Sequence, residues 1–161
     1  MATNGWPTDW DERIAGRDCP LCTTGPPSDT DHALHVTELE FVDVRLERRS
    51  RLPGYCVVVW RHGHVVEPTD LDPDLAAGYW RDVLAVARAV QSRFEPVKLN
   101  FLTLGNLVPH LHTHVVPRHE VDPAPGGFLP WDDLFADEPT PAAELDRQAE
   151  DLRLLLTGAG A

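Results

Sequence analysis

The sequence predicts a single domain that combines helices with strands, and three observations carry this prediction. The chain has 161 residues, a length close to one domain whose hydrophobic core needs no disulfides. Several short runs of apolar or β-branched residues have the pattern of strands. Two longer stretches carry apolar residues at helical spacing, and no internal repeat is visible. We therefore expect one domain over 1–161, made of an arm (1–33), a core (34–121) and a closing segment (122–161).

The N-terminal half is expected to form an irregular arm followed by the first strands. Residues before 34 are rich in Pro, Gly, Thr and Asp and carry little periodicity. Apolar residues then alternate with polar ones over 35–46, which predicts one or two half-buried strands. A turn at 50–54 leads into the continuous apolar run 55–60. Such a run is typical of a strand buried on both faces, so we expect 55–60 to lie centrally in the sheet.

A long helix is expected after the central strand. Asp72 and Pro73 supply an N-cap and a first-turn proline, and apolar residues follow at helical spacing as far as residue 90. Pro96 cannot continue a helix, so the helix should span roughly 72–94.

The C-terminal half is expected to hold a hairpin, a loop and a second helix. Segments 97–104 and 111–116 have strand patterns and are joined through Gly105 and Asn106, so we expect this hairpin to carry the chemistry. A loop rich in Pro and Gly covers 122–130. The stretch 141–156 predicts an amphipathic helix. Its expected apolar side consists of Leu145, Leu152, Leu155 and Leu156.

Charge and composition narrow the range of partners. The net charge is −12, which repels the backbone of long nucleic acids but leaves small nucleotides open as ligands. Hydrophobic residues at 42% and charged residues at 25% are typical of globular proteins, and no apolar run approaches the roughly 20 residues of a membrane span. The first residues lack the basic and apolar regions of a secretory signal, so we expect a cytoplasmic protein.

Three histidines at a spacing of two are the main chemical signal. His110, His112 and His114 would lie on one face of a strand, because side chains alternate between faces. Three neighbouring imidazoles can bind a metal, supply one nucleophile with supporting donors, or lie inertly at the edge of the core. Buried polar rings need partners, which makes the inert arrangement the weakest of the three.

The residues around the histidines resemble the histidine triad (HIT) family of nucleotide hydrolases and transferases. The run His110-Leu-His-Thr-His-Val-Val116 fits the family signature of three alternating histidines followed by hydrophobic residues. The following Pro117-Arg118, the strand Pro53-Gly-Tyr-Cys-Val-Val-Val-Trp60 and the Gly105-Asn-Leu-Val-Pro109 approach are similar to the family too. The resemblance covers roughly residues 18–120.

This resemblance implies a fold, a reaction and roles for several residues. The fold is α+β, with an antiparallel sheet of about five strands, one long helix, a C-terminal helix and pairing into a homodimer. His112 attacks the α-phosphorus of a purine nucleotide, a dinucleoside polyphosphate or a nucleoside phosphoramidate, and forms a nucleotidyl-histidine intermediate. The backbone carbonyl of His110 orients the ring of His112, and His114 hydrogen-bonds the phosphate or the departing oxygen. Asn100 and Asn106 donate to phosphate oxygens.

Departures from the family pattern leave some assignments open. Leu107 stands where many members have Ser or Thr, which removes one hydroxyl donor. The usual ribose-contacting asparagine is absent, and Glu47 or Arg45 falls nearest to its position. Arg118 is a candidate for binding phosphate, including a phosphate acceptor. Two alternatives to a hydrolase therefore remain: a dinucleoside polyphosphate phosphorylase, and a zinc-binding enzyme or non-catalytic nucleotide-binding protein.

Three cysteines are present, and two of them have the spacing of a metal half-site. Cys19 and Cys22 are separated by two residues, which suits zinc but also a redox pair. By the same family resemblance, and by similarity to the galactose-1-phosphate uridylyltransferases, His64 and His110 complete a structural zinc site, with His62 as an alternative to His64. A site using His32 or His35 is a further alternative. Cys56 lies in the apolar run 55–60 and is expected to be a buried hydrophobic residue.

Overall fold

The computed structural model describes residues 5–22, 27–122, 124–127, 135–136 and 138–158. Their elements follow in chain order as α1 Trp10–Ile14, β1 Ala33–Glu38, β2 Val42–Glu47, β3 Cys56–Trp60, the 3-10 turn η1 Pro68–Asp70, α2 Pro73–Phe94, β4 Lys98–Thr103, β5 His112–Arg118 and α4 Ala142–Thr157. The expected combination of about five strands with a long helix and a C-terminal helix is confirmed. None of the helices described is long and apolar enough to span a membrane.

The five strands form one antiparallel sheet in the order β1-β2-β3-β5-β4. The predicted central strand is confirmed, since β3 pairs with β2 on one side and with β5 on the other. Gly54 has a φ of +85°, a left-handed conformation that lets the chain turn sharply into β3. The hairpin expected from 97 to 116 is also present, because β4 pairs with β5.

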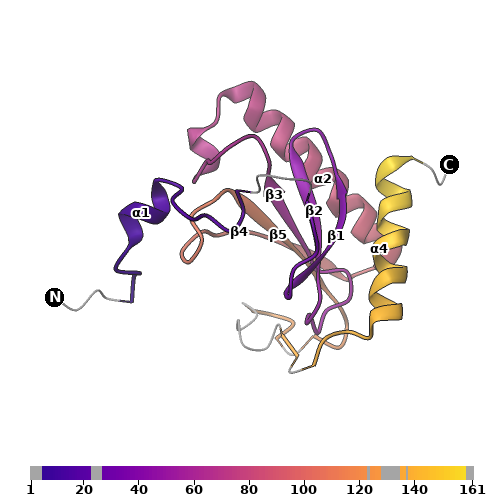
Figure 1. Ribbon diagram of the computed structural model, residues 1–161. Coiled ribbons are helices and arrows are strands. Elements are labelled where there is room, and N and C mark those ends of the chain that lie inside the picture. The colour runs from indigo at the N-terminus through magenta and orange to yellow at the C-terminus, as the bar shows by residue number, and fades with distance from the viewer. Residues whose placement is uncertain (1–4, 23–26, 123, 128–134, 137, 159–161) are drawn as a thin grey trace.

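One face of the sheet carries the hydrophobic core. The side chains of Val44, Val58 and Val115 point to this face, where α2 and α4 lie side by side and cover it (Figure 1). The helices contribute residues such as Val83 and Leu152, which are fully buried. Burying such side chains is the main source of the stability that holds sheet and helices together.

The opposite face carries His112, His114 and several charged residues. Strand register places Val59 between His112 and Asp43, and Val57 between His114 and Arg45. Residues opposite one another in neighbouring strands share a face, so these polar residues form rows across the side of the sheet away from α2.

Four local expectations need correction. The arm contains the short helix α1, which five residues made too brief to show a periodic pattern. Strand β2 is buried on both faces instead of half-buried, because its charged residues pair with one another. Asp72 precedes α2 as expected, but its side chain makes no capping hydrogen bond. In α4, Leu145 and Leu152 are buried as predicted, whereas Leu155 is 44% exposed because it lies on the outward side of the helix. Parts of the expected arm (1–4 and 23–26) and loop (123 and 128–130) lie outside the described residues.

Candidate functional site

Two of the three histidines lie in strand β5, and the third, His110, lies two residues before it. His112 and His114 lie in β5 on the same face, with ring centroids 5.0 Å apart. Strand β5 begins only at His112, so His110 lies just before it, in a bend where it lines a pocket with Asp43 and Arg45. Its amide donates to the carbonyl of Val108, and its ring turns toward the cysteines of the arm. His112 and His114 are therefore the two histidines that lie beside each other in β5.

His112 is held in one orientation by the backbone. Its Nδ1 lies 2.6 Å from the carbonyl oxygen of His110. Because a carbonyl can only accept, Nδ1 carries the proton and donates, which leaves the lone pair of the neutral ring on Nε2. Burial lowers the pKa of His112, and the hydrogen bond to His110 opposes this effect. A neutral imidazole with a fixed Nε2 lone pair is a nucleophile.

His114 contacts a tyrosine from the start of the neighbouring strand. Its Nδ1 lies 2.8 Å from the hydroxyl oxygen of Tyr55, and both residues are buried. Burial lowers the pKa of His114 to about 4, with a smaller contribution from His112. The ring is therefore neutral near pH 7.

A cavity of about 460 Å³ opens beside the two histidines. Its walls are the residues from Leu104 to Val108, including Asn106, together with His112 and His114. Arg13 of α1 donates to the carbonyl of Leu107 across 2.7 Å and so braces this loop from outside. The space is large enough for a phosphate group and part of a nucleotide.

The other predicted phosphate-binding residues are placed differently. Asn100 shares the face of His114, but its Oδ1 accepts from Arg118 Nη1 at 2.6 Å, so only the amide NH2 of Asn100 is left to donate. Arg118 directs its donors to Asp122, Asn100, Gly127 and Ala124. All five N–H groups are thereby engaged, so Arg118 holds the loop after β5 and has no donor left for phosphate. We correct its expected role on this ground.

Glu47 lies at the end of β2 on the side of the sheet that carries Tyr55. Its amide donates to the carbonyl of Tyr55 at 2.9 Å, and burial raises the pKa of its carboxyl group. Arg45, the alternative for contacting ribose, is bound to the carboxylate of Asp43 at 2.6 Å and is only 6% exposed. Glu47 is therefore the better placed of the two to meet a ligand.

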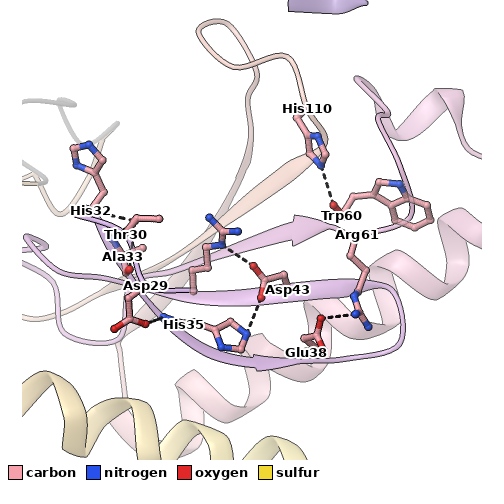
Figure 2. Close-up of polar contacts among 11 residues, drawn as sticks. Asp29, Thr30, His32, Ala33, His35, Glu38, Asp43, Trp60, Arg61 and His110 are labelled. Atoms are coloured by element: carbon pink, nitrogen blue, oxygen red, sulfur yellow. Dashed lines mark hydrogen bonds and ion pairs between the residues drawn. The ribbon is translucent and has the colours of Figure 1, made fainter. Parts of the chain in front are cut away.

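Asp43, a charged residue that the sequence did not single out, lies on the same face of the sheet as His112. Figure 2 shows the carboxylate of Asp43 next to the ring of His35, which comes from the adjacent strand β1. His35 Nε2 and Asp43 Oδ1 lie 2.9 Å apart but are not aligned as a hydrogen bond. The alternation of apolar residues in β2 placed Asp43 on the face opposite the core, but it gave no sign that Asp43 would be covered.

The two cysteines and two histidines form a compact cluster. One ligand atom from each of Cys19, Cys22, His64 and His110 lies within 4.8 Å of the others. The Nδ1 of His110 is 3.5 Å from Cys19 Sγ and 3.4 Å from Cys22 Sγ, and the Nδ1 of His64 is 3.3 Å from Cys22 Sγ. Ligands on a tetrahedral zinc ion have sulfur–nitrogen separations of roughly 3.5 Å, from Zn–S of about 2.3 Å and Zn–N of about 2.0 Å. The four atoms can therefore share one ion.

Both histidine rings in this cluster are fixed by the backbone at their second nitrogen. The Nε2 of His110 donates to the carbonyl of Trp60 at 2.8 Å (Figure 2), and the Nε2 of His64 donates to the carbonyl of Ile14 at 3.0 Å. This arrangement is usual for metal-bound histidines, because it fixes the tautomer that presents a lone pair to the ion. Burial and the neighbouring Cys19 raise the pKa of Cys22 to about 11, so a cation is needed to hold its thiolate at neutral pH.

The cluster contains His64 and leaves out the alternative histidines. The Nε2 of His62 donates to the carbonyl of Glu40 and lies outside the cluster, and His35 lies against Asp43. His32 is not among the clustered residues either. Cys56 is buried in the core, as expected for a small hydrophobic residue.

Comparison with curated proteins gives two informative relatives. The Protein hit of Bacillus subtilis is 34% identical over 89 residues, which cover 52% of this chain and 61% of that protein. A bis(5'-adenosyl)-triphosphatase of Saccharomyces cerevisiae is 22% identical over 98 residues, which cover 58% of this chain and 47% of the yeast protein. The chain thus spans about half to three fifths of the length of these relatives.

Solved structures and a family model also point to histidine triad proteins. A histidine triad protein from Bradyrhizobium japonicum has a TM-score of 0.70 at 27% identity and covers 78% of this chain and 92% of its own. A Zn-bound histidine triad family protein from Mycobacterium smegmatis has a TM-score of 0.57 at 21% identity and covers 94% of each chain, a likeness of fold alone. The model of the HIT domain matches residues 30–121. Together with the paired histidines of β5, these matches confirm the resemblance stated from the sequence: the chain belongs to the HIT family.

Proposed function

We propose that this protein is a nucleotide hydrolase or nucleotidyltransferase that cleaves its substrate at the α-phosphate through a nucleotidyl intermediate on His112. The observation that carries the proposal is the 2.6 Å hydrogen bond from His112 Nδ1 to the carbonyl of His110, which leaves a lone pair on Nε2. His112 also lines a cavity of about 460 Å³, where a phosphate can approach that lone pair.

The reaction has two steps in this proposal. Nε2 of His112 attacks the α-phosphorus, the bond to the leaving oxygen breaks, and the nucleotide is held on the imidazole. Water then attacks the same phosphorus, the P–N bond breaks, and nucleoside monophosphate leaves. His114 and Asn106 border the cavity, so they are placed to stabilise the phosphate oxygens as charge builds. The NH2 group of Asn100 is a third donor, and the carboxylate of Glu47 is suited to accept from ribose hydroxyls.

We propose purine nucleotides as substrates, with dinucleoside polyphosphates or nucleoside phosphoramidates as the substrate classes. The relative from Saccharomyces cerevisiae is a bis(5'-adenosyl)-triphosphatase, which supports a polyphosphate substrate. A phosphorylase, in which phosphate replaces water in the second step, remains a second candidate because Leu107 offers no hydroxyl to order a water molecule.

We also propose that Cys19, Cys22, His64 and His110 bind one structural zinc ion. The separations of their ligand atoms and the backbone partners of both rings fit a tetrahedral ion. The fold is shared with a Zn-bound family member from Mycobacterium smegmatis. When bound, the ion would attach the arm to the sheet and supply folding free energy.

A homodimer is the proposed assembly. Strand β4 is at the edge of the sheet, and large apolar side chains are exposed along and beside it. Val97 is 70% exposed, Phe101 39% and Leu104 40%. An edge strand with apolar side chains is suited to pair with a second copy of itself.

The decisive experiment is to trap the intermediate. Protein is mixed with dinucleoside polyphosphate, quenched at alkaline pH because P–N bonds hydrolyse in acid, digested and analysed by mass spectrometry. A nucleotide-sized adduct is expected on the peptide that contains His112, and His112→Ala should bind nucleotide but lose activity by several orders of magnitude. His119→Ala, which changes a histidine just after β5, is the matched control and should react normally.

Three results would count against parts of this proposal. No adduct together with full activity of His112→Ala would exclude His112 as the nucleophile. No adduct and no turnover would favour a nucleotide-binding protein or an enzyme that uses the metal directly. Turnover only after phosphate is added, with the diphosphate as product, would identify a phosphorylase.

A further inference from the structure

Tyr55 is buried directly beside the second histidine of the site. It is 1% exposed and lies one residue before β3, on the side of the sheet that carries His114. Its hydroxyl oxygen is 2.8 Å from His114 Nδ1, and the ring centroids are 5.8 Å apart. Phe135 stacks on Tyr55 and helps to fix the tyrosine ring. The contact is therefore built into a packed region.

The direction of this hydrogen bond follows from the partners of the hydroxyl group. A buried O–H must donate to an acceptor, and within the described part of the chain the partner of the Tyr55 hydroxyl is His114 Nδ1. Burial and the nearby Glu47 carboxylate raise the pKa of Tyr55 well above its ordinary value, so the hydroxyl keeps its proton. The O–H of Tyr55 thus donates, and Nδ1 of His114 accepts.

An accepting Nδ1 determines where the proton of the ring lies. A neutral imidazole carries one N–H, so the proton of His114 must be on Nε2. Burial lowers the pKa of His114 to about 4, which keeps the ring neutral at physiological pH. His114 borders the cavity, so a ring with Nε2–H brings a donor to the site.

The two histidines of β5 therefore hold opposite tautomers. A carbonyl oxygen makes His112 a ring with its proton on Nδ1, and a hydroxyl group makes His114 a ring with its proton on Nε2. If both rings had the same tautomer as His112, two lone pairs would face the negatively charged phosphate. Opposite tautomers give one lone pair to attack phosphorus and one donor to stabilise oxygen.

We propose that Tyr55 is a positioning residue for the reaction, which holds His114 in the Nε2–H form so that this ring donates to the phosphate or the leaving oxygen. This inference rests on the proposed function. His114 gives the leaving oxygen a hydrogen bond and keeps its proton, so leaving groups that depart as stable anions are favoured. Dinucleoside polyphosphates, which release a nucleotide anion, are therefore better substrates than phosphoramidates, which release an amine.

The test compares variants of two tyrosines whose hydroxyls both contact strand β5. Tyr55→Phe removes the hydroxyl from His114 Nδ1. Tyr79→Phe is the matched control, because the Tyr79 hydroxyl lies 2.7 Å from Thr113 Oγ1, is buried, and contacts β5 from the core side. Both variants lose one buried hydrogen bond, so a general loss of stability should affect them alike.

Two measurements separate positioning from structure. The ring nitrogen shifts of His114, recorded by NMR without substrate, should show the Nε2–H form in the wild type and in Tyr79→Phe, and a mixture of forms in Tyr55→Phe. The rate constant kcat for a dinucleoside polyphosphate should fall about tenfold or more in Tyr55→Phe, with KM little changed. A nitrophenyl ester of the same nucleotide needs little help to depart, so its kcat should fall far less.

The outcomes keep this inference apart from the proposed function. If the wild type neither turns over nor forms an adduct, the proposed function is wrong, while the NMR spectra still decide whether Tyr55 fixes the tautomer. An unchanged tautomer in Tyr55→Phe overturns the inference. An equal loss of rate with both substrates, or equal losses in both variants, overturns it as well.

Discussion

Acid should destabilise this protein through His114, and the structure gives the size of the effect. The pKa of His114 is lowered from 6.5 to about 4 by burial, and Tyr55 and His112 are titratable groups that contact it among the residues that the structure describes. In the unfolded chain the ring regains its ordinary pKa. Between pH 6.5 and 4 the unfolded state therefore binds more protons than the folded state, so the free energy of unfolding falls as the pH falls.

The expected magnitude is large compared with typical protein stability. Each unit of pKa difference is worth about 1.4 kcal/mol, so this one ring should account for a loss of about 3 kcal/mol between pH 7 and pH 4. Many domains are stable by only 5 to 15 kcal/mol in all. Above pH 6.5 both states are neutral at this position and the contribution of His114 no longer changes.

Denaturant unfolding of the wild type and His114→Gln at several pH values isolates this contribution. Gln cannot titrate in this range, so the difference in unfolding free energy between the two proteins should change by about 2 to 3 kcal/mol between pH 7 and pH 4.5. The proposed zinc ligands are the same in both proteins, so any loss of metal in acid cancels in the difference. Curves that stay parallel across this range would show that His114 is not buried as a neutral ring.

The remaining predictions concern the metal and the assembly. Cys22→Ala should reduce bound zinc from about one ion per chain to none and lower the melting temperature, whereas Cys56→Ala should keep its zinc; a zinc-free wild type, or full stability in Cys22→Ala, would contradict the site. Phe101→Asp should convert a dimer to a monomer in sedimentation, whereas Leu155→Asp, an exposed leucine on α4, should not; a wild type that is monomeric would exclude the dimer.

The sequence predicted those elements whose signal is local. The β-branched run before Trp60 was sufficient to predict the central strand, and Asp72, Pro73 and Pro96 bounded α2 to within one or two residues. The limits of such reasoning are visible in β2. Asp43 and Arg45 alternate with apolar residues as in a half-exposed strand, but they pair with each other, and burial of a paired charge leaves no trace in the hydrophobic pattern.

The candidate site likewise contains features that the sequence predicted and features that it did not. The spacing of Cys19 and Cys22 predicted a metal half-site, but the choice of His64 over His62 depends on how the loop after β3 turns. The predicted strand 111–116 begins after His110, as β5 does, but the spacing of the histidines could not show that the ring of His110 turns to Cys19 and Cys22. Tyr55 carried only the signal of a buried residue, since its partner lies 59 positions away in the chain.

His110 links the cluster of cysteines and histidines to the proposed nucleophile His112, and its two contacts belong to different parts of the residue. Its ring lies against Cys19 and Cys22, while its backbone carbonyl accepts from His112. The backbone here is also held independently of any metal, because Leu111 donates to Val65 and accepts from Trp60. Loss of a bound ion would remove a bond of the ring, whereas we expect these backbone hydrogen bonds to stay in place. The metal cluster is therefore suited to hold the arm on the sheet, and the tautomer of His112 depends on the sheet itself.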